Sequence, residues 1–264
     1  MNKKKMCWWI TEKCNENCKY CFRSLSSINK FNYEDHMKIL NQIIEFGTDQ
    51  ITWSGGEALL VPHAVKLMKY AKERGIYNKV TTNGKLLTKE KIDEIKPYTD
   101  LVALSIDSFN DKTNELLGRG KEQRERVIDR IEKLMESGIK VDVNTVVMRQ
   151  NINDLEDMAE FFRKHPISGK WKLMTFFPIR ETALKNKDEL EIDDQIFLEK
   201  VKDIIERYKD IKITYMMNDQ IQQQYPGVRA NGDLLVTKNG IDNILGNMTN
   251  KINQNPFKFI NENV

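Results

Sequence analysis

The chain of 264 residues is poor in cysteine, proline and glycine, and it contains no long apolar run. Its 6 prolines and 13 glycines are few for this length, and its 4 cysteines all lie near the N-terminus. A membrane span needs about 20 consecutive apolar residues, and no stretch of the chain approaches that length. The basic N-terminus is not followed by the apolar segment of a signal peptide. We therefore expect a cytoplasmic protein with no membrane partner.

The sequence also lacks an excess of one charge. Lys and Arg number 42 against 39 Asp and Glu, which leaves a net charge of +3. A nucleic-acid binder usually carries a larger basic excess, so we expect no nucleic-acid partner. Hydrophobic residues make up 40% of the chain, which is too many for a disordered protein. The length fits a single barrel of alternating strands and helices, which commonly needs about 250 residues.

Short β-rich runs alternate with longer helical segments along the chain. Apolar residues three and four positions apart, as at Met37, Leu40 and Ile44, predict amphipathic helices. Such strand–helix–strand repeats form parallel sheets through right-handed crossovers. The pattern predicts an α/β protein with a partial (β/α)6 TIM-like barrel over residues 1–216. The predicted strands lie at residues 6–11, 50–53, 79–82, 101–107, 141–147, 171–177 and 211–215.

The pattern changes after residue 216. Residues 225–236 predict a β-hairpin, with Asn231-Gly232 as its type I′ turn. We expect residues 217–264 to form a short C-terminal extension packed on the barrel.

Three of the cysteines, Cys14, Cys18 and Cys21, form a C-x3-C-x2-C loop directly after the first predicted strand. A disulfide framework would spread its pairs through the chain, so this crowding is typical of metal ligands. Three thiolates do not complete a structural zinc site, whereas a [4Fe–4S] cluster on three cysteines keeps one iron open. A zinc site completed by Cys7 or a histidine is the alternative. We expect Cys7, inside the first strand, to pack as a small buried hydrophobe.

The C-x3-C-x2-C loop followed by Phe22 resembles that of the radical S-adenosylmethionine (SAM) superfamily. The resemblance implies a [4Fe–4S] cluster and SAM as cofactors, with SAM on the open iron. It further implies that the reduced cluster cleaves SAM to a 5′-deoxyadenosyl radical, which abstracts hydrogen from a substrate. An external reductant such as flavodoxin or ferredoxin would supply the electron.

Polar residues at the ends of other predicted strands extend this resemblance. Ser54-Gly55-Gly56-Glu57 resembles the GGE motif of the superfamily, in which the backbone and the glutamate hold the methionine amine of SAM. Polar side chains inside apolar strands need partners, and a bound ligand can supply them. The resemblance therefore implies that SAM or the substrate contacts the following residues: Gly55, Gly56, Glu57, Thr82, Asn83, Ser105, Asp107 and Asn144.

Within the superfamily, residues 105–110, 117–120, 144–147 and 171–172 resemble those of viperin-like proteins, which dehydrate a nucleoside triphosphate. The resemblance places Arg119, Lys170, Lys172 and Tyr225 at the substrate, where basic groups suit phosphates. One position departs from the pattern. Asp142 stands where viperin has a phosphate-binding lysine, and a carboxylate there is expected to repel a triphosphate.

Two other functions stay open from the sequence. Residues 228–235 and 244–248 resemble the tail of peptide-modifying radical SAM enzymes, although the cysteines of their auxiliary clusters are absent. An epimerase or cross-linking enzyme acting on a ribosomally made peptide is therefore an alternative, with Cys7 as the spare thiol and Asp142 suited to a cationic or amide-rich substrate. A non-catalytic iron–sulfur sensor is a third function, but it would not need a SAM pocket.

Overall fold

The protein is described by a computed structural model for residues 3–23, 31–120, 123–221 and 225–260. One sheet runs through it, with the strand order β10-β9-β8-β1-β2-β3-β4-β5-β6-β7. The strands β1 to β7 lie side by side in chain order, and every neighbouring pair among them is parallel. Their bounds are Lys5–Trp9, Gln50–Ser54, Tyr77–Thr82, Leu101–Ser105, Lys140–Val147, Trp171–Thr175 and Ile213–Met216.

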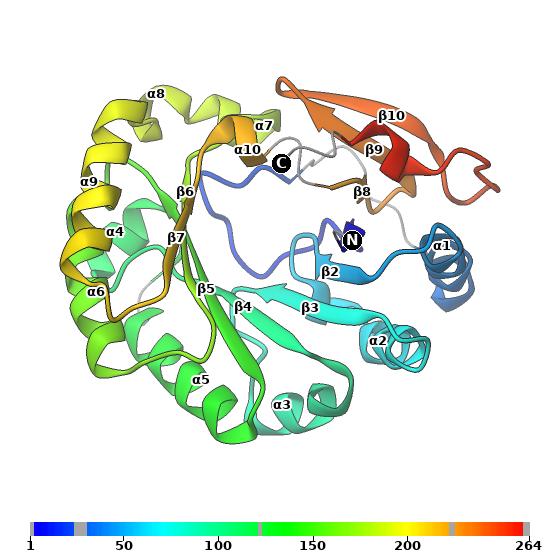
Figure 1. Ribbon diagram of the computed structural model, residues 1–264, viewed down its shortest axis with the longest axis horizontal. Helices are drawn as coiled ribbons and strands as arrows, with labels where there is room; N and C mark the ends of the chain where they lie inside the picture. Colours follow the sequence, from blue (N-terminus) through cyan, green and yellow to red (C-terminus); the bar gives the residue numbers. More distant parts are fainter. Residues whose placement is uncertain (1–2, 24–30, 121–122, 222–224, 261–264) are drawn as a thin grey trace.

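Six helical crossovers connect these parallel strands, and Figure 1 shows the helices along the outer side of the curved sheet. This confirms the predicted α/β class with a parallel sheet, and the strand order and curvature agree with a partial (β/α)6 barrel. The main crossover helices are α1 (Tyr33–Glu45), α2 (Ala64–Lys72), α3 (Lys89–Ile95), α5 (Gln123–Ser137), α6 (Leu155–Lys164) and α9 (Asp194–Arg207). Shorter elements are η1 (Ala58–Leu60), η2 (Lys96–Tyr98), α4 (Asp111–Leu116), η3 (Ile152–Asp154), α7 (Arg180–Lys185), α8 (Lys187–Leu190), α10 (Asn218–Ile221) and η4 (Pro256–Phe259).

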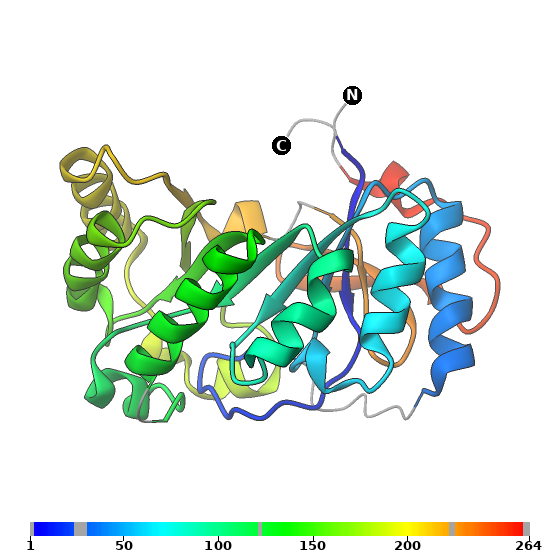
Figure 2. The same cartoon turned by 90° about the horizontal axis from the view of Figure 1, so that it is seen from below.

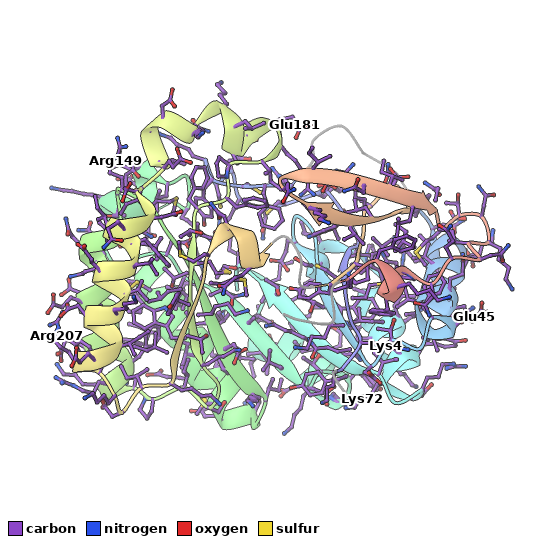
Figure 3. The ribbon with its side chains drawn as sticks, turned by 45° about the horizontal axis from the view of Figure 1, so that its top comes forward. Lys4, Glu45, Lys72, Arg149, Glu181 and Arg207 are labelled. Carbon is purple, nitrogen blue, oxygen red and sulfur yellow. The ribbon has the colours of Figure 1, made fainter. Side chains whose placement is uncertain are left out.

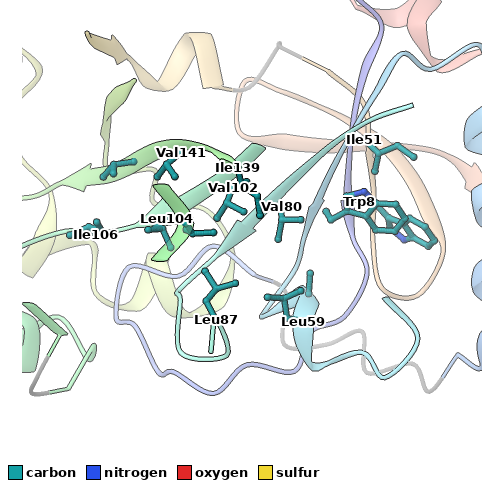
Figure 4. Packing of buried hydrophobic residues seen from close by; sticks show 14 of the residues in the cluster. Trp8, Ile51, Leu59, Val80, Leu87, Val102, Leu104, Ile106, Ile139 and Val141 are labelled. Atoms are coloured by element: carbon teal, nitrogen blue, oxygen red, sulfur yellow. The ribbon is translucent and has the colours of Figure 1, made fainter. Parts of the chain in front are cut away.

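Local sequence signals explain where these helices begin and end. Asn32 caps α1 in a capping box with Asp35, and Gly47, with a φ of +76°, follows the end of the helix. Figure 2 shows α1, α2, α3 and α5 in a row along the outer face of the sheet. The buried apolar residues of these helices and of the strands form the hydrophobic core between them. Figure 4 shows the alternate strand residues that pack there, among them Trp8, Ile51, Val80, Val102, Leu104 and Val141.

The C-terminal extension continues the same sheet beyond β1. Strand β8 (Gly227–Val228) pairs in parallel with β1, while β9 (Asp233–Lys238) and β10 (Ile241–Asn247) add antiparallel strands. The hairpin predicted at 225–236 exists as β8–β9, but its type I′ assignment is wrong. A four-residue connection joins these two strands, so Asn231 does not need a positive φ. The two-residue turn is Asn239-Gly240, with φ of 51° and 74°, between β9 and the unpredicted β10.

Charged residues cover the outside of the molecule, as Glu45, Lys72 and Arg207 show in Figure 3. Among the described residues, no helix combines the length and the apolar character that crossing a membrane requires.

Candidate active site

The cysteine loop follows β1 and is neither helix nor strand over residues 10–23. Its three cysteines are partly buried and unbridged. Burial raises the pKa of Cys18 to about 12. Burial also raises the pKa of Cys21, and the nearby Cys14 raises it further. Cys18 and Cys21 would therefore be thiolates at neutral pH only with a metal bound to them.

The Gly55-Gly56-Glu57 turn after β2 is hydrogen-bonded to the start of this loop. The Gly56 N–H donates to the Thr11 carbonyl at 2.6 Å, and the Glu57 N–H donates to the Lys13 carbonyl at 2.8 Å. A Cβ atom at Gly56 would lie 2.2 Å from the Lys13 carbonyl oxygen, and Gly55 has a φ of +135°. The resemblance suggested that these residues lie against SAM. The described contacts of the two glycines are with the cysteine loop, and their contact with SAM stays a prediction.

Glu57 is buried and joins the ends of β2 and β3. Its carboxylate accepts hydrogen bonds from Thr82 Oγ1 at 2.9 Å, the Asn83 N–H at 3.0 Å and the Leu59 N–H at 3.2 Å. Burial raises the pKa of Glu57 despite these bonds. The Asn83 side chain then reaches the cysteine loop, where its Nδ2 donates to Asn15 Oδ1 at 2.7 Å and lies 3.9 Å from Cys14 Sγ.

A buried ionic network holds the other side of the loop. Arg119 donates from Nη1 to Glu16 Oε2 at 2.7 Å and from Nε to Asp107 Oδ2 at 2.8 Å. Tyr20 of the cysteine loop also donates to Asp107, whose second oxygen accepts the Val146 N–H at 2.9 Å. The network thus ties the loop to the ends of β4 and β5.

This network gives Arg119 and Asp107 structural partners that the sequence did not reveal. Both were expected at a ligand, yet the Arg119 guanidinium is 5% exposed and already faces two carboxylates. Its role on a phosphate stays a prediction, while its described contacts position the cysteine loop. Glu16 and Tyr20 were missed, and the only signal for them was an acidic and an aromatic residue inside a metal-binding loop.

A row of polar side chains crosses the concave face of the sheet. Register pairs Ser105 of β4 with Asn144 of β5, Asn144 with Lys172 of β6, and Lys172 with Thr214 of β7. The Asn144 Oδ1 and Thr214 Oγ1 atoms are buried without a hydrogen-bond partner among the described residues. A buried polar atom without a partner costs about 1–3 kcal/mol, so the row is suited to a ligand that pairs them. Thr214 was not predicted.

Asp142 lies on the same face, one pleat before Asn144, and its charge is paired. Lys79 Nζ of β3 lies 3.6 Å from Asp142 Oδ2, and the Lys170 N–H donates to Asp142 Oδ1 at 3.0 Å. Burial, followed by the nearby charges of Lys79 and Lys170, lowers the pKa of Lys172 to about 8. The expected repulsion by Asp142 is therefore offset by Lys79, which the sequence did not single out.

Cys7 of β1 belongs to the same face, and Tyr225 precedes β8, which pairs with β1. Cys7 of β1 is 7% exposed, as expected of a buried residue, but it alternates with the core residues Met6 and Trp8 and pairs in register with Gly227. Burial raises the pKa of Cys7 to about 12, and Lys79 and Arg180 are near enough to oppose this rise. Burial, and then the nearby Cys7, raise the pKa of Tyr225.

Residues 9–162, which contain the cysteine loop and the GGE turn, match the sequence profile of the radical SAM superfamily. The chain belongs to the radical SAM superfamily. It is therefore an enzyme that uses SAM, and this membership argues against the non-catalytic sensor.

Nucleotide dehydratases are among the relatives of this chain. An S-adenosylmethionine-dependent nucleotide dehydratase of Flammeovirga pacifica is 31% identical over 228 residues, which cover 80% of this chain and 78% of the relative. One from Lacinutrix mariniflava is 30% identical over 82% of this chain, but the match spans only 47% of that longer relative. The solved structure of anSMEcpe with bound AdoMet and the Cp18Cys peptide has a TM-score of 0.78. It covers 97% of this chain and 80% of the solved one at 16% identity, which shows a shared fold.

The cysteine loop of this radical SAM enzyme fits a cluster better than a single metal ion. Within the described ranges, no three His, Cys, Asp or Glu side chains converge closely enough to hold one ion. A [4Fe–4S] cluster gives each thiolate its own iron, so its ligands need not converge on one point. Three unbridged thiols on one wrapped loop match that need.

Proposed function

We propose that this radical SAM enzyme acts on a nucleotide, as the names of its dehydratase relatives indicate, and that this nucleotide is a nucleoside triphosphate. The observation that carries the proposal is the basic concave face. Lys79 pairs with the Asp142 carboxylate there, the backbone N–H of Lys170 donates to it, and the charges of Lys79, Lys170 and Asp142 all act on Lys172. Burial, and then the ammonium groups of Lys79 and Lys170, lower the pKa of Lys172, and a bound anion would stabilise its charged form. Arg119 lies outside this lysine cluster and contributes its positive charge from the side of the cysteine loop.

The residues of the site divide into three groups in this proposal. Cys14, Cys18 and Cys21 hold the cluster. The ends of β2, β3 and β4 (Gly55 to Glu57, Thr82, Asn83, Ser105 and Asp107) orient SAM and the loop. Asn144, Lys170, Lys172 and Tyr225 face the substrate. When bound, the reduced cluster and SAM supply one-electron cleavage of the SAM sulfonium and hydrogen abstraction from the substrate. A protein such as flavodoxin or ferredoxin is the proposed reductant.

The chain's own residues set the conditions for that chemistry. Buried Glu57 and the Arg119 network fix the cysteine loop against four strand ends, so its thiols are held before metal binds. The unpaired Asn144 and Thr214 oxygens supply hydrogen-bond acceptors, and the threonine also a donor, beside Lys172. A triphosphate bound there gains charge-assisted hydrogen bonds from the lysines.

The test is 5′-deoxyadenosine release by the anaerobically reconstituted enzyme with dithionite and SAM, adding ATP, CTP, GTP and UTP one at a time. We expect at least one triphosphate to stimulate release, and we expect Lys172→Met to abolish the stimulation without changing cluster content. If no triphosphate stimulates release from an enzyme with a full cluster, the nucleotide proposal is wrong.

A peptide substrate is the second candidate, and the position of Cys7 favours it. The thiol lies on the concave face beside Tyr225, where it can donate a hydrogen atom to a substrate radical. An epimerase of this kind requires the Cys7 thiol as hydrogen donor. In the Cys7→Ala variant, the substrate radical would not be quenched, and the substrate would stay at the radical stage or be degraded. A nucleotide dehydratase would form the same product after Cys7→Ala as before it, which distinguishes the two candidates.

A further inference from the structure

Arg180 stands out because its backbone conformation is costly. It begins α7 with a φ of +63°, and apart from Asn239 no non-glycine residue of the described chain has a positive φ. Asn tolerates this region through its short polar side chain, whereas a long side chain such as Arg gains nothing from it. The surrounding contacts must hold Arg180 in place, and such strained residues concentrate at functional sites.

The Arg180 guanidinium makes contacts in three directions. Its Nε and Nη2 donate to both carboxylate oxygens of Asp242 on β10, at 2.9–3.1 Å. Its Nη1 donates to the Phe22 carbonyl at 2.7 Å, one residue after Cys21. The same group lies over the Trp9 ring at the end of β1, 5.4 Å from its centroid, and 5.8 Å from that of Phe22. Only 11% of the side chain is exposed, which strengthens the ion pair.

Asp242 is itself fixed by the C-terminal strands. Thr237 Oγ1 of β9 donates to Asp242 Oδ1 at 2.7 Å, and Arg229 pairs with Oδ2. Figure 1 shows β9 and β10 beside α7 at the mouth of the curved sheet. The C-terminal strands therefore reach the end of the cysteine loop through one guanidinium.

We propose that Arg180 is a positioning residue that fixes the Cys21 end of the cluster loop to the C-terminal strands. The proposal rests on the assignment of Cys21 as a cluster ligand, and it makes β9 and β10 part of the support of the cluster. The competing role is purely structural, in which Arg180 only holds the C-terminal strands down. Arg229 provides a matched control, because it binds the same Asp242 carboxylate but has no described contact with the loop.

The test compares Arg180→Gly, Arg180→Lys, Arg229→Gln and the unmodified chain by hydrogen exchange of the cluster-free protein. Glycine accepts the φ of +63° without strain, so Arg180→Gly removes the guanidinium alone. The Lys19 and Cys21 amides are hydrogen-bonded in the loop and serve as reporters. We expect Arg180→Gly to accelerate their exchange about tenfold or more, as loss of a charged hydrogen bond predicts. Arg180→Lys should restore only part of the protection, because one ammonium cannot replace the planar fork.

Arg229→Gln should change exchange in residues 233–247 and leave the loop amides unchanged. After reconstitution, the EPR spectrum of the reduced cluster should broaden in Arg180→Gly but not in Arg229→Gln. The proposal is overturned if the loop amides exchange equally in Arg180→Gly and the unmodified chain, or if both variants affect them equally. These readouts need no substrate. Altered loop exchange in an enzyme that responds to no nucleotide would therefore contradict the proposed substrate and leave the role of Arg180 standing.

Discussion

At the residue scale, the concave face combines a paired charge with polar atoms that have no described partner, and sequence alone identified neither arrangement. Lys172 lies beside the unpaired Asn144 and Thr214 oxygens, and Asp142 is matched by Lys79. The chemistry of the face is therefore set by paired charges and by polar atoms without a partner, rather than by single residues. Two of these features give direct predictions.

The lowered pKa of Lys172 predicts that triphosphate binding weakens in alkaline solution. Its folded-state pKa of about 8 lies below the usual 10.5, so the ammonium is present below pH 8 and lost above it. We expect affinity to fall about tenfold between pH 7 and pH 9, because one pKa unit corresponds to a factor of ten. The unfolded chain keeps this proton up to about pH 10.5, so the same group makes the fold more stable as pH rises from 8 to 10.5.

Isothermal titration with a nucleoside triphosphate at pH 7 and pH 9 checks this prediction. Lys172→Arg is the matched control, since a guanidinium stays protonated throughout and should bind equally at both values. An unmodified enzyme that binds equally at pH 7 and pH 9 would contradict the assignment of Lys172 to the phosphates.

Thr214→Val tests whether the unpaired hydroxyl serves a ligand. The substitution removes an oxygen that has no described partner, so the free energy of unfolding should stay the same or rise slightly. Triphosphate affinity should fall by about threefold to tenfold, the equivalent of one hydrogen bond. Thr145→Val is the control, because Thr145 Oγ1 donates to the Ile106 carbonyl and accepts from Trp171 Nε1. That control should lose stability, and a stability loss in Thr214→Val would show a structural hydroxyl instead.

At the scale of elements, the sequence predicted what depends on local periodicity and missed what depends on partners far along the chain. All seven parallel strands follow from apolar runs, and α1 follows from the spacing of Met37, Leu40 and Ile44 and from the terminal Gly47, whereas α3 was not predicted. The turn at Asn231-Gly232 was misassigned because its length depends on where β8 pairs with β1. The Glu16–Arg119 and Lys79–Asp142 pairs join residues 103 and 63 positions apart, respectively, which no local pattern encodes.

The GGE turn predicts a steric effect on the neighbouring loop. Gly56→Ala would place a Cβ atom 2.2 Å from the Lys13 carbonyl oxygen and 2.8 Å from that of Glu12. Both are backbone atoms, so the start of the cysteine loop must move. We expect the variant to fold but to retain little iron after reconstitution, measured by iron analysis and the visible absorption of the cluster. Gly138→Ala is the control: its φ of +80° strains the backbone, but the new Cβ meets no atom within 4 Å and lies away from the cysteine loop, so the variant should bind iron normally. Full iron content in Gly56→Ala would show that the loop tolerates the displacement.

At the scale of the whole molecule, the near-neutral net charge of +3 conceals an uneven distribution. Acidic and basic side chains alternate over the outer helices, where pairs such as Lys69–Glu73 and Lys133–Asp129 are exposed. The concave face instead gathers lysines from β3 and β6 around one carboxylate from β5. A small net charge is thus compatible with a strongly anion-attracting site, because the sheet brings distant basic residues together.

The pairing of Lys79 with Asp142 makes this distribution testable with a double-mutant cycle. Asp142→Asn removes the carboxylate and frees Lys79, so triphosphate affinity should rise severalfold. Lys79→Met leaves Asp142 buried and unpaired, and affinity should fall by more than about tenfold, since an uncompensated charge acts strongly in such a site. Because the two residues neutralise each other, the double variant should return close to the unmodified affinity, a non-additivity typical of directly interacting charges. Titrations at two salt concentrations should show the largest salt dependence for Asp142→Asn, whose face carries the greatest positive charge. Additive effects of the two substitutions would mean that Lys79 and Asp142 act independently, and that the carboxylate opposes a triphosphate as the sequence alone suggests.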